Sequence, residues 1–201
     1  MAAEVVLKTL EHVWNVLSQL PVRKALMGGL AVAFWKHLRL TQDVDILIAV
    51  DDSALADLVA RLQAADMRGK RSSPVLHFGP QKIIQVLYQP PGSFLDIQVD
   101  LLVAPDDYAR NALTRAQPAV LPGVAEPIDV LTCEDLVIHK LIAGRILDQA
   151  DAAALLRINS KDLDFAYLKD WIDRLGLRKE WEDVVGEAFP SERPPATQWG
   201  G

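Results

Sequence analysis

Two carboxylates one residue apart, Asp43 and Asp45, stand at the head of an apolar run that continues to Val50. In a β-strand, residues two apart point to the same side, about 6.6 Å apart along the strand, so both carboxylates would face one spot. Two such anions at ~4 Å repel by roughly 1 kcal/mol in water and several-fold more near a protein surface. Divalent cations relieve this repulsion, and a two-metal site needs carboxylates that can bridge two ions. The pair therefore favours metal-assisted phosphoryl chemistry; a capped loop before a core strand is the alternative.

The glycine pair Gly28-Gly29 lies between a short apolar run that predicts a strand and a longer one, residues 30–35, that predicts a helix. Glycines at such a turn let the backbone approach a phosphate, and the first amides of the helix point toward it. A tight turn that needs no ligand is the alternative. The residues between Gly29 and Asp43 leave room for a helix that returns the chain to the neighbouring strand. We therefore expect the glycine turn and the two aspartates at the same end of one sheet.

A third carboxylate comes from a strand that the sequence predicts over residues 94–103, which carries both Asp96 and Asp100. The two share strand parity, so either could face the metal site, but they lie about 13 Å apart along the strand, too far for one compact site to use both. Asp100 precedes an apolar run much as Asp45 does. Adjacent strands would bring those two carboxylates to one level, so we expect Asp100 to complete the site.

A later helix, with Thr132 as its expected N-cap, carries a further candidate site residue, Lys140. At 100° per residue, Lys140, Gly144, Asp148 and Asp151 fall within about 80° on one helix face. A solvated stripe with helix-stabilising lysine–aspartate spacing is one interpretation. Gly144 costs a helix interior about 1 kcal/mol relative to alanine, which calls for a packing or ligand reason. On the functional interpretation, Lys140 neutralises the β- and γ-phosphates of a nucleotide.

Two segments together resemble a known signature: residues 27–31 (Met-Gly-Gly-Leu-Ala) and residues 39–47 (Arg-Leu-Thr-Gln-Asp-Val-Asp-Ile-Leu). The sequence resembles the polymerase-β-type nucleotidyltransferase superfamily, whose signature is a Gly-Gly or Gly-Ser turn, a helix, and Asp-hydrophobic-Asp. Within it, the chain is most similar to the AbiEii/AbiGii-type toxin nucleotidyltransferases. Arg-x-Thr-x-Asp-x-Asp recurs there, with a later Lys-Leu-x-Ala-Gly-Arg segment, here residues 140–145, followed by aspartates. The resemblance extends from about residue 20 to residue 180.

This resemblance implies a metal-dependent enzyme that moves a nucleoside monophosphate from a nucleoside triphosphate to an acceptor hydroxyl, with Mg²⁺ in a two-metal site. An in-line attack on the α-phosphate would expel pyrophosphate, and Asp100 would help deprotonate the attacking hydroxyl. The expected site residues are, for catalysis and Mg²⁺, Asp43, Asp45 and Asp100, and, for the nucleotide, Gly28, Gly29, Thr41 and Lys140.

By the same resemblance the acceptor is RNA, such as a tRNA end, in a toxin–antitoxin setting with a cognate antitoxin protein as partner. Two alternatives stay open. One is a nucleotidyltransferase that modifies a small molecule, of the aminoglycoside or lincosamide sort. The other is a catalytically silent binding module that keeps the fold, although a silent site would be free to lose its unfavourable carboxylate cluster.

Charge and composition limit the partners. The net charge of −6 and the pI of about 5.2 count against a broad nucleic-acid footprint. The densest local basic patch, which offers either RNA contacts or a solvated loop, consists of Arg61, Arg68, Lys70 and Arg71. The single cysteine, Cys133, excludes an internal disulfide and favours a reducing cytoplasm. No apolar run approaches the ~20 residues that span a bilayer, so no membrane is expected.

The order of elements predicts an α+β fold, a nucleotidyltransferase-like mixed sheet flanked by helices with a helical C-terminal region. With 201 residues the chain can bury roughly 70% of its unfolded surface. We expect a nucleotidyltransferase core over residues 1–117 and a mostly helical region over residues 118–201, which could form one compact unit with the core. The remaining expected elements are helices over 6–20, 53–65 and 107–116, strands over 75–78 and 82–88, a loop over 118–127 with one short strand before Ile128, and a Pro-rich tail from Pro190.

Overall fold

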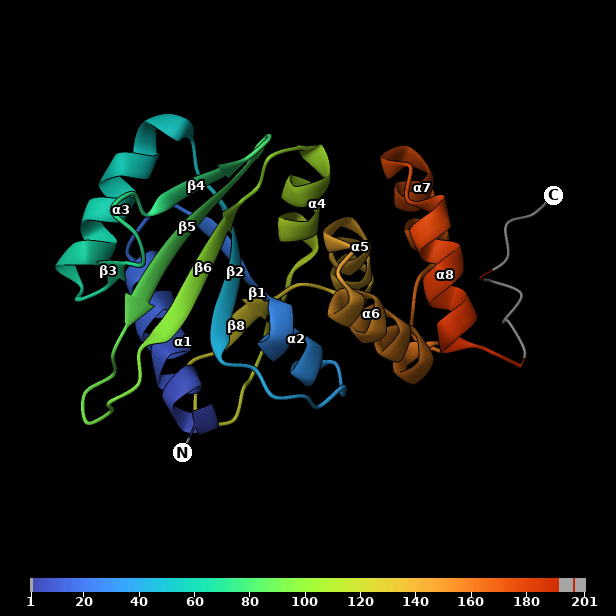
Figure 1. The fold of residues 1–201 in the computed structure, drawn as a ribbon, viewed down its shortest axis with the longest axis horizontal. Helices are drawn as coiled ribbons and strands as arrows, with labels where there is room; N and C mark the ends of the chain where they lie inside the picture. The colour runs from blue at the N-terminus through green and yellow to red at the C-terminus, as the bar shows by residue number, and fades with distance from the viewer. Residues whose placement is uncertain (1, 192–196, 198–201) are drawn as a thin grey trace. The chain divides into compact units, whose positions relative to one another are not determined.

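The computed structural model of the chain describes residues 2–191 and 197 (Figure 1). The chain divides into two compact units. The first comprises residues 1–31 and 40–131, and the second comprises residues 32–39 and 132–201. Most of the Pro-rich tail that the sequence indicated, residues 192–196 and 198–201, lies outside the described residues.

The first unit is built on a mixed sheet with strand order β3-β5-β6-β2-β1-β8-β7, and β4 pairs with β5 beside this path. Strand β2 runs parallel to β6 and antiparallel to β1, and β5 runs antiparallel to β6. This confirms the expected mixed sheet. The strands are β1 (Arg23–Met27), β2 (Asp43–Ala49), β3 (Arg68–Gly69), β4 (Val75–Phe78), β5 (Gln81–Tyr88), β6 (Ile97–Val103), β7 (Gln117–Ala119) and β8 (Ile128–Val130).

The helices of the first unit follow the apolar spacing of the sequence. In the first helix, Val6, Leu10, Val13 and Leu17 recur at three- and four-residue intervals and are all buried. Asp106 caps the helix after β6, since its side chain accepts a hydrogen bond from the backbone nitrogen of Ala109 at 2.8 Å. The helices are α1 (Ala2–Ser18), α2 (Gly28–Phe34), the 3₁₀ turn η1 (Asp52–Ala54), α3 (Leu55–Ala64) and α4 (Asp107–Arg115).

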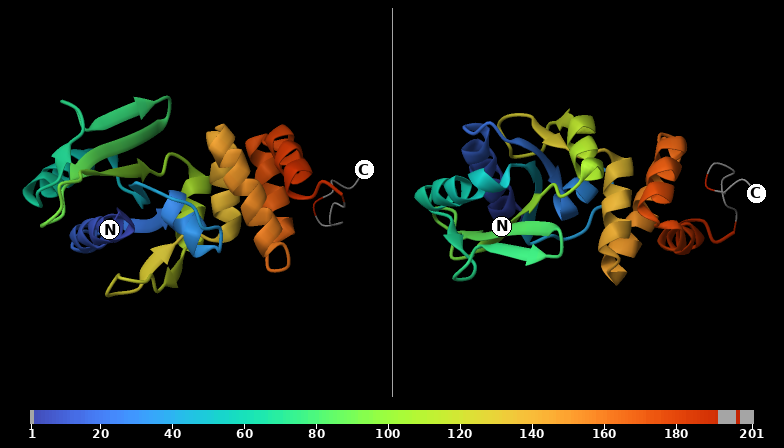
Figure 2. Two further views of the ribbon diagram at one scale, coloured as in Figure 1. Left: turned by 60° about the horizontal axis from the view of Figure 1, so that its bottom comes forward. Right: turned by 90° about the horizontal axis from the view of Figure 1, so that it is seen from above.

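The two faces of the sheet differ in polarity. Along β2, Val44, Ile46 and Ile48 are fully buried and share one face of the sheet. Helices α1 and α4 pack against this strand, and Figure 2 shows the ribbon from two further sides. Asp43 and Asp45 alternate with them and point to the opposite face, where they are half-buried. One face of β2 therefore packs into the core, and the opposite face carries the two carboxylates at the start of the strand.

The second unit is helical, with α5 (Cys133–Ala143), α6 (Ile146–Asn159), α7 (Phe165–Leu175) and α8 (Arg178–Ala188). Helix α6 packs against α5 and α8, and its central residues 152–156 are all buried. Thr132 caps α5, as expected: its side chain accepts a hydrogen bond from the backbone nitrogen of Asp135 at 3.3 Å. Residues 32–39 join this unit through contacts such as the hydrogen bond from the Asn159 side chain to the carbonyl oxygen of Trp35.

One prediction about this unit is wrong. The sequence predicted a single helix carrying Lys140, Gly144, Asp148 and Asp151 on one face, whereas α5 ends at Ala143 and α6 begins at Ile146. Gly144 is the C-cap, with a left-handed φ of 65°. Glycine adopts this conformation without the steric cost that other residues bear, so the cap supplies the reason for Gly144.

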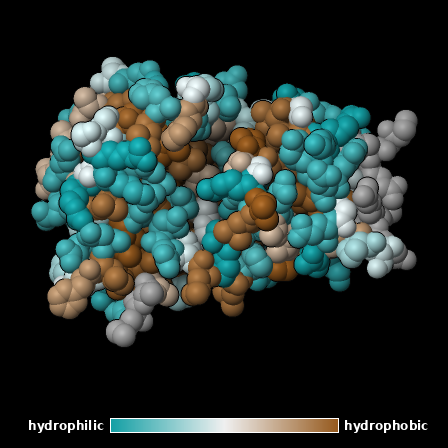
Figure 3. All heavy atoms as spheres, in the orientation of Figure 1, coloured by the Kyte–Doolittle hydropathy of each residue, from teal (hydrophilic) through white to brown (hydrophobic). Residues whose placement is uncertain are grey.

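Smaller differences concern the ends of strands. The strand predicted from residue 94 begins at Ile97, so Asp96 lies just before it. Strand β3 was not expected. The segment before Ile128 contains the short strand β7, which pairs with β8. Strand β8 also pairs with β1 in the sheet. On the face seen in Figure 3, hydrophilic residues alternate with apolar patches. Among the described residues, no helix is both long and apolar enough to cross a membrane.

Candidate active site

Three carboxylates lie on the polar face of neighbouring strands. In the parallel pairing of β2 with β6, Asp45 is opposite Asp100 and Asp43 is opposite Gln98. Residues opposite each other in neighbouring strands point to the same face of a sheet. The expectation that Asp45 and Asp100 stand at one level is therefore confirmed. The other residue considered, Asp96, lies outside the strand, and its carboxylate pairs with the guanidinium of Arg68.

The glycine turn lies directly against this carboxylate group. Met27, the last residue of β1, is opposite Asp45, and α2 begins at the next residue, Gly28. Gly28 has a left-handed φ of 64°, and a Cβ atom added there would lie 1.9 Å from Oδ2 of Asp45. Only glycine fits both the backbone and the space. The expected closeness of the turn and the aspartates is thus confirmed, while nucleotide binding by Gly28 and Gly29 stays a prediction.

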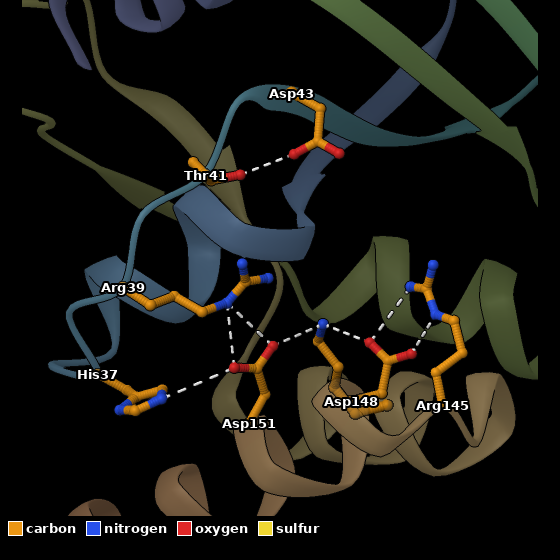
Figure 4. Close-up of polar contacts among 8 residues, drawn as sticks. His37, Arg39, Thr41, Asp43, Arg145, Asp148 and Asp151 are labelled. Atoms are coloured by element: carbon orange, nitrogen blue, oxygen red, sulfur yellow. Dashed lines mark hydrogen bonds and ion pairs between the residues drawn. The ribbon is translucent and has the colours of Figure 1, made fainter. Parts of the chain in front are cut away.

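Asp43 is oriented by a residue of the preceding loop. The hydroxyl of Thr41 donates a hydrogen bond to Oδ1 of Asp43 at 2.7 Å (Figure 4). The bond orients the carboxylate at the start of β2. Thr41 was expected among the nucleotide-binding residues; in the structure it positions Asp43, and any contact with a nucleotide stays a prediction.

Asp100 is held by two amide side chains. Nε2 of Gln98 lies 2.9 and 2.8 Å from the two carboxylate oxygens, and Nε2 of Gln85 donates to Oδ1 at 3.1 Å. The ammonium of Lys70 in turn donates to the side-chain oxygen of Gln98. Burial raises the pKa of Asp100 above its ordinary value and the charge of Asp43 adds to this, while the hydrogen bonds from Gln98 and Gln85 and the charge of Lys70 oppose it. A carboxyl group with a raised pKa is a better base than an ordinary one.

The candidate metal ligands are Asp43, Asp45 and Asp100. Carboxylate oxygens are the ligands that Mg²⁺ prefers, and Asp43 and Asp45 point to one face with room made by Gly28. Within residues 2–191 and 197, no group of three His, Cys, Asp or Glu side chains is already arranged to hold a metal. The metal assignment for Asp43, Asp45 and Asp100 therefore stays a prediction.

Lys140 belongs to a buried ion-pair cluster inside the second unit. Its ammonium lies 2.7 Å from Oδ1 of Asp148 and 2.9 Å from Oδ2 of Asp151, and the residue is only 7% exposed. The guanidinium of Arg39 approaches Asp151 at 3.0 Å, and that of Arg145 approaches Asp148 at 2.5 Å (Figure 4). A lysine that is bound by two buried carboxylates has a structural reason to be present. The expected phosphate contact of Lys140 stays a prediction.

Three members of the basic patch, for which the sequence left RNA contacts or a solvated loop open, have partners within the protein. Arg61 pairs with Asp57 one helical turn away at 2.9 Å, and Arg68 and Lys70 bind Asp96 and Gln98, respectively, as described above.

Sequence reasoning missed the amide residues around Asp100. Gln98 could have been found, because it shares the strand parity of Asp100; Gln85 could not, because its place opposite Asp100 depends on the β5–β6 register.

A cavity of about 440 Å³ opens beside Asp43, at the end of the sheet where the parallel strands β2 and β6 begin. All of its walls come from the first unit. The lining residues are Val6, Thr41, Gln42, Asp43, Leu87, Leu95, Asp96, Ile97 and Gln98. A cavity of this size is in the range of small-molecule sites.

Comparison with known proteins identifies the fold. The sequence matches no family profile and no curated protein. Among solved structures, the chain is similar to an antigenic nucleotidyltransferase-like protein from Paracoccidioides brasiliensis, with 18% identity, 96% of each chain covered and a TM-score of 0.54. The chain has a nucleotidyltransferase fold.

Two further structures agree with this assignment. The antibiotic-resistance factor ANT(2'')-Ia is 13% identical, with 92% of this chain and 96% of that chain covered and a TM-score of 0.52. JHP933 from Helicobacter pylori is 17% identical, with 92% and 80% covered and a TM-score of 0.50. These neighbours support the nucleotidyltransferase fold, and none of them points to the AbiEii/AbiGii type.

Proposed function

We propose that the protein is a metal-dependent nucleotidyltransferase that moves a nucleoside monophosphate from a nucleoside triphosphate to an acceptor hydroxyl. The observation that carries this proposal is the juxtaposition of Gly28 with Asp45 and of Asp45 with Asp100 on one face of the sheet. Carboxylates this close repel one another unless they serve a cation or a proton transfer. A fold shared with nucleotidyltransferases supports the same assignment.

In this mechanism each residue has one task. Asp43 and Asp45 would hold Mg²⁺, which would neutralise charge on the phosphates. The backbone at Gly28 and Gly29 lets the triphosphate approach closely. Asp100 accepts the proton of the acceptor hydroxyl, and Gln98 and Gln85 keep its carboxylate turned toward the site. The hydroxyl oxygen forms a bond to the α-phosphorus, and the bond to pyrophosphate breaks in line.

The acceptor expected from the resemblance is RNA, such as a tRNA end, and the biological setting is a toxin controlled by an antitoxin. This remains part of the proposal on the strength of the sequence motif alone. Support from surface charge is weak, because Arg61 and Arg68 already pair with acidic side chains. A small-molecule acceptor is the second candidate, and the same engagement of the basic patch favours it.

The test is nucleotide-dependent stabilisation together with transfer. Mg²⁺ with the correct nucleoside triphosphate should raise the melting temperature, since a ligand at 100-fold its Kd stabilises a protein by about 2.7 kcal/mol. Each of the four nucleotides, α-labelled, is incubated with Mg²⁺ and total RNA or a small-molecule panel to find the acceptor. Asp43→Asn and Asp45→Asn should lose transfer while staying folded. Normal transfer by either variant would show that the metal assignment is wrong.

A further inference from the structure

We infer that Lys70 is a positioning residue for the proposed reaction: it orients the side-chain amide of Gln98, which in turn holds the carboxylate of Asp100. The inference rests on the proposed function, in which Asp100 accepts the proton of the acceptor hydroxyl. It adds a residue that acts on that step without touching the reacting atoms. Lys70 belongs to the basic patch for which the sequence left RNA contacts or a solvated loop open. The hydrogen bond of its ammonium gives it a different task.

The register of the sheet brings Lys70 close to Asp100. Lys70 follows β3 directly, and its backbone nitrogen donates a hydrogen bond to the carbonyl oxygen of Gln85 in β5 at 3.2 Å. Gln85 is opposite Asp100 in the pairing of β5 with β6. From this place the side chain of Lys70 reaches across β5, and its ammonium donates a hydrogen bond to the side-chain oxygen of Gln98 on β6. Strand pairing on both sides of β5 therefore fixes the start and the end of this contact.

The direction of the hydrogen bonds shows what the lysine contributes. An ammonium has three donors and no acceptor, so it can bind the oxygen of an amide side chain but not its nitrogen. With the oxygen of Gln98 held by Lys70, the nitrogen faces Asp100 and lies 2.9 and 2.8 Å from the two carboxylate oxygens. An amide turned the other way would direct its oxygen at the carboxylate, and neither group could donate. Lys70 thus selects the orientation of Gln98 in which the amide holds Asp100.

The second amide at Asp100 does not replace this support. Gln85 donates to Oδ1 of Asp100 at 3.1 Å, and Oδ2 receives its hydrogen bond from Gln98. Without an oriented Gln98, one hydrogen bond from Gln85 leaves the carboxylate free to turn about it. A base that is misplaced by such a rotation loses part of its effect, because proton transfer requires the base within hydrogen-bond reach of the hydroxyl. Arg68, two residues before Lys70, binds Asp96 instead.

The first test needs no substrate. In ¹H–¹⁵N NMR spectra of the protein without ligands, the side-chain amide signals of Gln98 are identified as those that Gln98→Met removes. Lys70→Met keeps the length of the side chain without its charge and should shift these signals toward those of a free glutamine. Lys8→Met, which removes a lysine that pairs with Glu4 on α1, is the control and should leave them in place. Unshifted Gln98 signals in Lys70→Met would overturn the inference.

The second test measures the consequence for transfer, with the nucleotide and acceptor that the unaltered protein uses. Lys70→Met should lower kcat about tenfold, a part of the roughly 10²–10⁴-fold that a positioned base supplies, and leave the KM for the nucleotide unchanged. Lys70→Arg keeps a cationic donor and should recover most of the rate. In a Gln98→Met background, Lys70→Met should have no further effect on kcat, because the lysine acts through that amide.

The outcomes separate this inference from the proposed function. An unchanged kcat in Lys70→Met would overturn the inference alone. So would an equal loss with and without Gln98, because Lys70 would then contact a substrate directly. Absence of both transfer and nucleotide-dependent stabilisation in the unaltered protein would instead refute the proposed function, and the role of Lys70 with it.

Discussion

At the scale of single residues, the register of β6 separates two aspartates that the sequence left as rivals. Asp100 lies opposite Asp45 and is half-buried, whereas Asp96 precedes the strand and pairs with Arg68. We expect Asp100→Asn to abolish transfer, because an amide cannot accept the proton of the acceptor hydroxyl. Asp96→Asn should keep both kcat and KM within a few-fold, because Asp96 lies outside the strand and its partner is an exposed arginine. A paired steady-state assay measures both, and the reverse pattern would mean that the roles are exchanged.

Gly28 gives a second residue-scale prediction. A methyl group at Gly28 meets Oδ2 of Asp45 at 1.9 Å, whereas Gly92 has a similar left-handed φ of 78° with nothing within 4 Å of its added Cβ. Backbone strain costs both alanine variants about 1–2 kcal/mol. Gly28→Ala should in addition displace Asp45 and abolish nucleotide-dependent stabilisation. Gly92→Ala is the control, and thermal unfolding with and without Mg²⁺ and nucleotide measures the two contributions. Stabilisation of both variants by nucleotide would contradict the role given to Gly28.

The sequence was sufficient for part of this site. Strand parity placed Asp43 and Asp45 on one face, and the similar apolar runs after Asp45 and Asp100 placed those two at one level. The amides that hold Asp100 could not be found in the same way. Gln85 reaches it only through the antiparallel register of β5 and β6, which long-range packing sets and no local pattern reveals.

At the scale of elements, the break between α5 and α6 changes the meaning of Lys140. On one continuous helix its side chain would have lined a solvated or ligand-binding stripe. The turn at Gly144 instead folds α6 back beside α5, so that Asp148 and Asp151 bind the lysine in a buried cluster. Helical periodicity could not reveal this, because the apolar spacing continues across a glycine that either interrupts or caps a helix.

The cluster predicts a large loss of stability when the lysine is removed. Lys140→Ala leaves two buried carboxylates without their shared cation, and breaking a buried ion pair costs about 3–5 kcal/mol. Lys161→Ala, an exposed lysine of the same unit, should change the free energy of unfolding by less than about 0.5 kcal/mol. Urea unfolding near neutral pH compares the two. A similar small change in both variants would return Lys140 to an exposed or ligand-binding role.

The pH dependence of this loss follows from Asp148. Burial raises the pKa of Asp148, but hydrogen bonds from Arg145 and Lys140 and their charges lower it to a net value below the ordinary 3.8. The unfolded chain therefore binds the proton first as the solution is acidified. The stabilisation by the cluster is present above about pH 4 and is lost as the pH falls through the lowered pKa. The difference in the free energy of unfolding between Lys140→Ala and the unaltered protein should therefore shrink as the pH falls below about 4, and it should stay constant above that pH.

At the scale of the whole molecule, the division into units could not be read from the sequence. Residues 32–39 come soon after the glycine turn in the sequence, yet they belong to the same unit as the helices after residue 132. The hydrogen bond from Arg39 to Asp151, 112 positions later, illustrates this. The mixed sheet, its flanking helices and the helical C-terminal region were predictable, because each rests on local periodicity and turn residues. Which distant segments share a unit depends on tertiary contacts that leave no local pattern.

The single cysteine offers a direct measure of how firmly the helical unit is closed. Cys133 is buried at the start of α5, and burial, together with the charge of Glu134, raises the pKa of its thiol to about 12. Because the ordinary value is 9.0, the folded protein carries about 1,000-fold less thiolate than the unfolded chain near pH 8, and the thiolate is the reactive form. We therefore expect an aromatic disulfide reagent to label the native protein on the order of 1,000-fold more slowly than protein in guanidinium. Lys140→Ala should restore part of the labelling rate, because the variant unfolds more often. Rapid labelling of the native protein would mean that α5 exposes its first turn to solvent.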